Sequence, residues 1–137
     1  MRRSFTILIT AVIALFLFNP VASAGSPHFL GVSAERSGDS LIVSGKEAGL
    51  GNETQVHIVV TADALCINGG GKHPKAVNKA SASAEGDFPV QNGKANFSLT
   101  LTADFQPDCS PPMTVVWTNV TVTDAEHGIS KSFPGTF

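Results

Sequence analysis

The chain has 137 residues, of which 42% are hydrophobic and 15% charged, and its formal net charge at pH 7 is −2. This length provides one hydrophobic core but not two, so we expect a single domain. The mildly acidic balance argues against nucleic-acid binding, because contacts to phosphates need a concentrated basic surface.

The first 24 residues have the three-part pattern of a secretory signal peptide. Arg2 and Arg3 open the segment, an apolar stretch covers residues 7–18, and small residues end it at Ala24. The apolar stretch has about a dozen residues, whereas a membrane-spanning helix needs about 20. We expect cleavage after Ala24 and an extracellular, secreted domain over residues 25–137 that does not contact a membrane. An uncleaved membrane anchor is the alternative.

The exported chain carries a formal charge of −4, because cleavage removes two arginines and no acidic residue. Alternation of apolar and polar side chains predicts strands along it, and no stretch has helical periodicity. In chain order the predicted strands are 29–35, 40–45, 55–62, 79–85, 94–102, 113–123 and 129–133. In the two clearest of them the side chains expected inside are Val56, Ile58, Val60, Phe97, Leu99 and Leu101, and those expected outside include Asn96, Ser98 and Thr100.

Two of the predicted strands have special features. Segment 79–85 alternates alanine with serine, which favours an edge strand. Segment 113–123 has the strongest β-propensity, but its phase is ambiguous, since Val120 and Val122 share one face while Val115 and Trp117 share the other. Either this strand is buried on both sides near its start, or a β-bulge shifts its phase.

Seven short strands without helices predict an all-β fold, an antiparallel immunoglobulin-like sandwich, with a small β-barrel as the alternative. The third and sixth strands of such a sandwich are antiparallel neighbours. Cys66 follows the third predicted strand and Cys109 precedes the sixth, so both lie at one end of the molecule. We therefore expect a disulfide that ties two long loops together and contributes about 4 kcal/mol, with two free buried thiols as the alternative.

The most unusual segment runs from Cys66 to Asn78 and reads C-I-N-G-G-G-K-H-P-K-A-V-N. Loops longer than about 12 residues without secondary structure are often functional. We interpret the segment as a candidate binding loop, and the side chains and glycines assigned to it are Asn68, Gly69, Gly70, Gly71, Lys72, His73, Lys75 and Asn78. The alternative is a covering loop that packs Ala76 and Val77 against the end of the sandwich.

Signals for chemistry are weak, and we expect no catalytic residue, no metal and no cofactor. The run Gly69 to Lys72 lacks the Ser or Thr that a phosphate-binding loop needs, and Pro74 removes a backbone donor. A zinc site from His73 and the two cysteines is conceivable, but thiols of an exported protein are expected to be oxidised. No serine lies in a G-x-S-x-G sequence.

The residues Asn52, Asn96 and Asn119 begin N-x-[ST] sequons, which matter only in a glycosylating host.

The chain resembles a family of small exported β-sandwich proteins to which no activity is assigned. The resemblance rests on K-E-A-G-L-G-N at 46–52, on C-I-N-G-G-G-K-H-P-K-A-V-N-K at 66–79, on the late Cys109 and on the terminal G-T-F. It implies a secreted β fold and no particular activity or catalytic residue.

We therefore expect a secreted, non-catalytic domain that binds an extracellular protein or a surface glycan through its disulfide-linked loops. The alternatives are a structural envelope or coat component that associates with itself, and a small secreted hydrolase. The chain has no tyrosine and one tryptophan, which favours a protein partner because sugars usually stack on aromatic rings.

Overall fold

A computed structural model gives the structure of the protein and describes residues 26–69 and 76–137. The predicted signal segment, residues 1–24, lies outside these described residues. Seven strands form in these described residues, and each coincides with one of the predicted segments apart from differences at the ends. Their bounds are β1 (His28–Ser37), β2 (Ser40–Ala48), β3 (Gln55–Asn68), β4 (Ala76–Pro89), β5 (Ala95–Leu101), β6 (Met113–Asp124) and β7 (Ile129–Phe133). The described part of the chain includes no helix with the length and apolar character that a membrane crossing requires.

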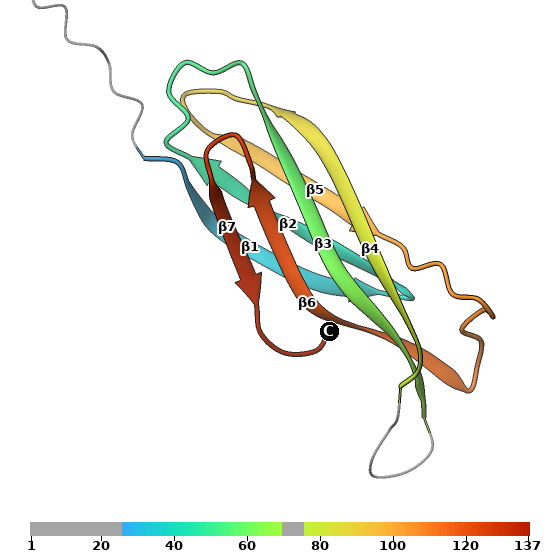
Figure 1. Ribbon diagram of the computed structural model, residues 1–137. Helices are drawn as coiled ribbons and strands as arrows, with labels where there is room; N and C mark the ends of the chain where they lie inside the picture. Colours follow the sequence, from blue (N-terminus) through green and yellow to red (C-terminus); the bar gives the residue numbers. More distant parts are fainter. Residues whose placement is uncertain (1–25, 70–75) are drawn as a thin grey trace, which may run out of the picture.

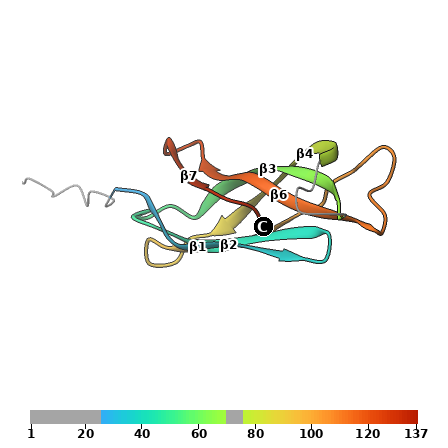
Figure 2. The ribbon, with the colours of Figure 1, turned by 90° about the horizontal axis from the view of Figure 1, so that it is seen from below.

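The strands form two antiparallel sheets, one of order β1-β2-β5 and the other of order β4-β3-β6-β7 (Figure 1). Figure 2 shows the layer of β1 and β2 below the layer that contains β3, β6 and β7. The pairing of β3 with β6 and the edge position of β4 confirm the predicted seven-stranded antiparallel sandwich. The fourth strand pairs with the third, whereas in constant-type immunoglobulin domains it joins the first sheet.

The core lies between the two sheets because each strand turns its apolar face inward. Its largest fully buried side chain is Trp117, whose Nε1 donates a hydrogen bond of 3.2 Å to the carbonyl oxygen of Asp39. The alternation predicted for β3 and β5 is confirmed at all but one position. Leu99 is only half-buried, which corrects the prediction; β5 is the edge strand of its sheet, so this side chain is left partly uncovered.

A β-bulge resolves the ambiguous phase of β6. Thr61 of β3 lies opposite Thr121, but Asp63 lies opposite Thr118, so β6 carries one residue more than β3 over this step. Asn119, with φ of 53°, occupies the left-handed region at this point. The extra residue turns both halves of the strand toward the same core, and the side chains buried by it are Val115, Trp117, Val120 and Val122. The bulge alternative is therefore the correct one.

The prediction of a loop from Cys66 to Asn78 is wrong at both ends of the segment, because strands extend into it. The two 14-residue strands β3 and β4 pair as far as Cys66 opposite Asn78 and Ile67 opposite Ala76. The physical reason is that β3 lies between two neighbours, so that Ile67 also pairs with Thr114 of β6. Backbone groups on both sides of β3 thereby find partners, and the strand continues beyond its last clearly alternating residues.

The predicted disulfide between Cys66 and Cys109 is present, with a Cα–Cα distance of 5.7 Å. Neither cysteine is free, which excludes the two-thiol alternative and a zinc site built from these thiols. Cys66 lies within β3 and Cys109 in the connection between β5 and β6. The bridge therefore ties a central strand to one long connection, whereas we expected it to join two loops.

Candidate functional site

The predicted binding loop lies only partly within the described residues. Asn68 and Gly69 are exposed where β3 ends, and Asn78 of β4 donates a hydrogen bond of 3.3 Å from Nδ2 to the carbonyl oxygen of Gln106. The other members of the predicted loop lie outside the described residues, namely Gly70, Gly71, Lys72, His73 and Lys75. Binding by this loop therefore stays a prediction.

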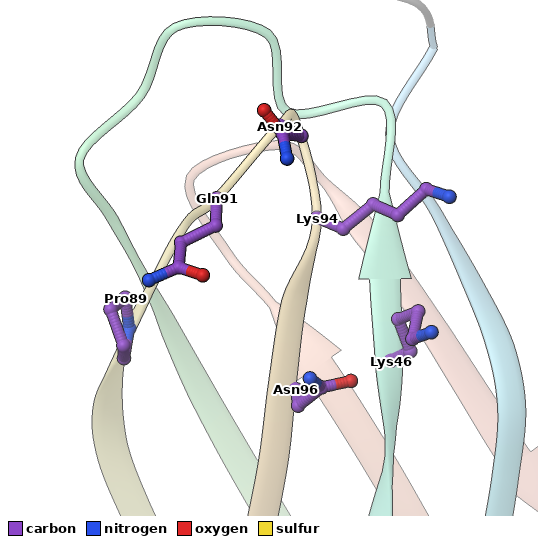
Figure 3. A pocket seen from close by; sticks show the side chains of 6 residues that line it. All are labelled: Lys46, Pro89, Gln91, Asn92, Lys94 and Asn96. Carbon is purple, nitrogen blue, oxygen red and sulfur yellow. The ribbon is translucent and has the colours of Figure 1, made fainter.

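A concave site of about 420 Å³ lies over the outer side of β2 and β5 and the turn between β4 and β5 (Figure 3). The disulfide lies at the other end of the sandwich. Lys46 of β2 and Asn96 of β5 are directly opposite each other in the strand register. Figure 3 shows Lys94 extending from the start of β5 toward the end of β2. The residues that line the site are Lys46, Pro89, Gln91, Asn92, Lys94 and Asn96.

A tight turn holds the amide groups of this site in place. Asn92 and Gly93 have φ of 53° and 74°, as the type I′ turn favoured by an Asn-Gly pair requires. Gln91 and Lys94 exchange two backbone hydrogen bonds of 2.8 and 3.1 Å across the turn. The carbonyl oxygen of Gly93 also accepts a hydrogen bond of 3.0 Å from the backbone of Leu50, so the turn is anchored to the segment between β2 and β3.

A second hollow of about 310 Å³ adjoins the first and shares Lys46 and Asn96 with it. Leu30 of β1 lines it and is 43% exposed, the one large hydrophobic side chain in the described residues with such exposure. A bulge in β1 brings Val32 against Gly45, where a Cβ would lie 2.8 Å from Cγ2 of Val32. We call the combined surface the basic face, and its members are Leu30, Lys46, Gln91, Asn92, Lys94 and Asn96.

The charges of the basic face are unbalanced. Among the described residues, neither Lys46 nor Lys94 forms an ion pair. By contrast, Lys79, at the other end of the molecule, lies 3.3 Å from a carboxylate oxygen of Asp63. The basic face therefore presents two positive charges and three amide side chains, in a chain whose overall formal charge is negative.

Two other polar clusters lie on the outer surface of the four-stranded sheet. His57 of β3 contacts Asp87 at 2.7 Å and Glu85 at 3.0 Å, and hydrogen bonds to Asp87 and then Glu85 raise its pKa above the ordinary value. A hydrogen bond from Asn119, together with those from Ser81 and Lys79, lowers the pKa of Asp63. Both clusters link neighbouring strands, as opposite charges on adjacent strands commonly do.

The positions of the sequon asparagines determine where a glycan could be attached, and the position of the tryptophan determines whether a glycan could stack on it. Asn52 and Asn96 are exposed, but Asn119 donates a hydrogen bond of 2.8 Å from Nδ2 to Asp63. Trp117 is fully buried and the chain has no tyrosine, so neither residue type offers an exposed ring on which a sugar could stack.

Alternation predicts Asn96 on the outside of its strand, but no local pattern indicates the rest of the basic face. The predicted second strand, 40–45, ends one residue before Lys46, whereas β2 continues to Ala48. Continuing the alternation from Leu41 and Val43 would have placed Lys46 outward, opposite Asn96. Comparison of the chain with protein-family models, with curated proteins and with solved structures finds no match.

Proposed function

We propose that the protein is an exported, non-catalytic binding domain, and that its basic face binds an acidic segment of an extracellular protein. The observation that carries this proposal is the pair of lysines without ion-pair partners in the described residues, Lys46 and Lys94, at a hollow lined by amide side chains. Carboxylates are the natural partners of such a surface, since the lysines neutralise them and the amides donate hydrogen bonds.

Leu30 favours a protein partner over a glycan. It adds an apolar contact beside the two lysines, and interfaces commonly combine an apolar anchor with a polar rim. The burial of Trp117 points the same way, because carbohydrate sites usually expose aromatic rings.

Export is supported by the signal-like start of the chain and by the disulfide, which is characteristic of oxidising compartments. Binding without catalysis is supported by the contacts of the histidines. A catalytic histidine would contact a hydroxyl group that it activates as a nucleophile. In the described residues, the ring contacts are to a backbone carbonyl for His28 and to carboxylates for His57 and His127.

The test uses three probes on isotope-labelled protein: a glutamate-rich peptide that contains leucine, its glutamine counterpart, and a polyuronate oligosaccharide. We expect the acidic peptide alone to shift the amide resonances of Lys46, Asn92, Lys94 and Asn96, with an affinity that falls as salt is added. The double variant Lys46→Gln/Lys94→Gln should weaken binding about 2- to 30-fold, because each charge contact at the surface contributes about 0.2–1 kcal/mol.

Lys79→Gln is the matched control, since it removes a lysine from β4, at the other end of the molecule, and should leave the affinity unchanged. The proposal is wrong if the acidic peptide causes no shifts at the basic face, or if the double variant binds as the wild type does. Stronger binding of the polyuronate would replace the protein partner by a glycan.

A further inference from the structure

Two carboxylates that the proposed function does not use meet inside the sandwich. Glu47 at the end of β2 and Asp124 at the end of β6 each have an exposed fraction of 0%. Each continues the inward alternation of its strand, Glu47 after Val43 and Asp124 after Val122. Because β2 and β6 belong to opposite sheets, the two side chains converge between the sheets, at the end opposite the disulfide.

An imidazole completes the cluster. His127, in the turn between β6 and β7, contacts Oδ2 of Asp124 through Nδ1. Its other ring nitrogen, Nε2, lies 2.8 Å from Oε1 of Glu53, in the segment between β2 and β3. The second oxygen of Asp124 accepts backbone hydrogen bonds of 3.0 and 3.2 Å from Glu126 and His127, which fixes its orientation.

Glu47 is the member without a donor. Neither of its carboxylate oxygens has a hydrogen-bond donor among the described residues. One oxygen of Glu47, one of Asp124 and one ring nitrogen of His127 all lie within 4.8 Å of one another. Burial, followed by the neighbouring Asp124, raises the pKa of Glu47 to about 8. A buried carboxylate facing another carboxylate needs either a proton or a cation between them.

We propose that Glu47, Asp124 and His127 form a binding site for a divalent transition-metal ion of the Zn²⁺ type. Two carboxylates and one imidazole are hard and borderline donors that suit Zn²⁺, Mn²⁺ or Co²⁺. Ca²⁺ fits poorly, because it takes about six to eight oxygen ligands and the cluster offers few. Three protein ligands leave room for a water molecule as the fourth.

Glu53 is a positioning residue of this site, because it holds the ring of His127. Ligating histidines commonly donate their second N–H to a carboxylate, which fixes the ring and the tautomer. With Nε2–H donated to Glu53, Nδ1 is left to face the ion beside Asp124. The side chains of His127 and Glu53 are 18% and 41% exposed, so the cluster reaches solvent between the β2–β3 segment and the β6–β7 turn.

The ion would connect the two sheets at the end where no disulfide does so. Glu47 belongs to the three-stranded sheet and Asp124 to the four-stranded sheet, whereas the disulfide joins β3 to the β5–β6 connection at the other end. This inference rests on different residues from the basic face and stands independently of the proposed function.

The test is calorimetric titration of the metal-free, disulfide-bonded protein with Zn²⁺, followed by Mg²⁺ and Ca²⁺ as comparisons. We expect one saturable Zn²⁺ site per chain, at least 100-fold weaker binding of Mg²⁺ and Ca²⁺, and a Tm that rises with Zn²⁺ concentration. Co²⁺ bound in place of Zn²⁺ should give visible absorption bands characteristic of mixed nitrogen and oxygen ligands.

Glu47→Gln and His127→Gln should each lower the Zn²⁺ affinity at least tenfold and shift the rise in Tm to at least tenfold higher Zn²⁺ concentration. Without metal, Glu47→Gln should melt at or above the wild-type temperature, because it removes a buried ionisable group, so its loss of binding cannot be assigned to unfolding. His57→Gln is the matched control: it changes an exposed histidine that also lies between two carboxylates, and should leave the affinity unchanged.

Absence of saturable Zn²⁺ binding would overturn the proposal and assign the Glu47–Asp124 pair to a shared proton. Zn²⁺ binding that survives Glu47→Gln but is lost in His57→Gln or His73→Gln would overturn it as well, because the ion would then be bound elsewhere.

Discussion

Asn119 of β6 donates a hydrogen bond of 2.8 Å from its side-chain amide to Oδ2 of Asp63 on β3. The contact lies at the step where the register of the two strands shifts, and Asn119 has a positive φ there. Asparagine suits this position, since it adopts the left-handed region more readily than other non-glycine residues and its short side chain reaches a local partner. The bulge in turn places Trp117 and Val120 in the same core.

Asn119→Ala should therefore lower the free energy of unfolding by about 1–3 kcal/mol, from the cost of positive φ and the lost hydrogen bond. Asn119→Gly keeps the backbone conformation without strain and should cost less than the alanine variant. Urea denaturation of both variants measures the difference. Asn96→Ala, at an exposed strand position, is the control and should be nearly neutral. Equal costs for the alanine and glycine variants would contradict a role for the backbone conformation.

Removal of the disulfide should destabilise the domain by about 4 kcal/mol on the chain-entropy account, given the sequence separation of 43 between Cys66 and Cys109. The double variant Cys66→Ser/Cys109→Ser should show this as a lower Tm and a lower urea midpoint. Intact mass before and after reduction and alkylation checks the bridge itself. Two thiols that react without prior reduction would refute it.

Alanine substitutions at three neighbouring positions of β5 should lower the free energy of unfolding by different amounts. Leu101 is 1% exposed, so Leu101→Ala should cost about 2–5 kcal/mol. Leu99 is half-buried at the edge of its sheet, so Leu99→Ala should cost roughly half as much. Thr100 is exposed, so Thr100→Ala should cost well under 1 kcal/mol. Chemical denaturation of the three variants gives the order directly. A Thr100→Ala cost as large as that of Leu101→Ala would mean that the inward face is wrongly assigned.

His57 should titrate above the ordinary histidine value of about 6.5, because its protonated ring donates to Asp87 and Glu85. A raised pKa in the folded state means that protonation stabilises the fold. This stabilisation is fully present below the pKa of the unfolded chain and is lost as the pH rises through the folded-state pKa. An NMR titration of the ring measures the midpoint in the folded protein and in urea.

The two carboxylates provide internal controls for that titration. Asp87→Asn should lower the His57 midpoint more than Glu85→Gln, since the hydrogen bond from Asp87 makes the larger contribution. A midpoint no higher in the folded protein than in urea would show that these contacts do not persist in solution.

Local patterns were sufficient to locate the strands. Alternation in a segment such as 94–102 depends only on residues two positions apart, and the Asn92-Gly93 turn depends on the φ values that this pair tolerates. The pairing of Cys66 with Cys109 followed from there being two cysteines in a chain whose first residues predict export. The limits of these patterns show at Cys66, where the flanking glycines and lysine indicate a loop although β3 continues.

Packing between distant segments decided the remaining features. Continued alternation would place Glu47 and Asp124 inward one at a time, but only the facing of the two sheets brings their carboxylates together. In the same way, Lys46 and Lys94 share a surface because β2 pairs with β5. The physical reason is that strand propensity is local, whereas the choice of neighbouring strand and of facing sheet depends on the burial of the whole core.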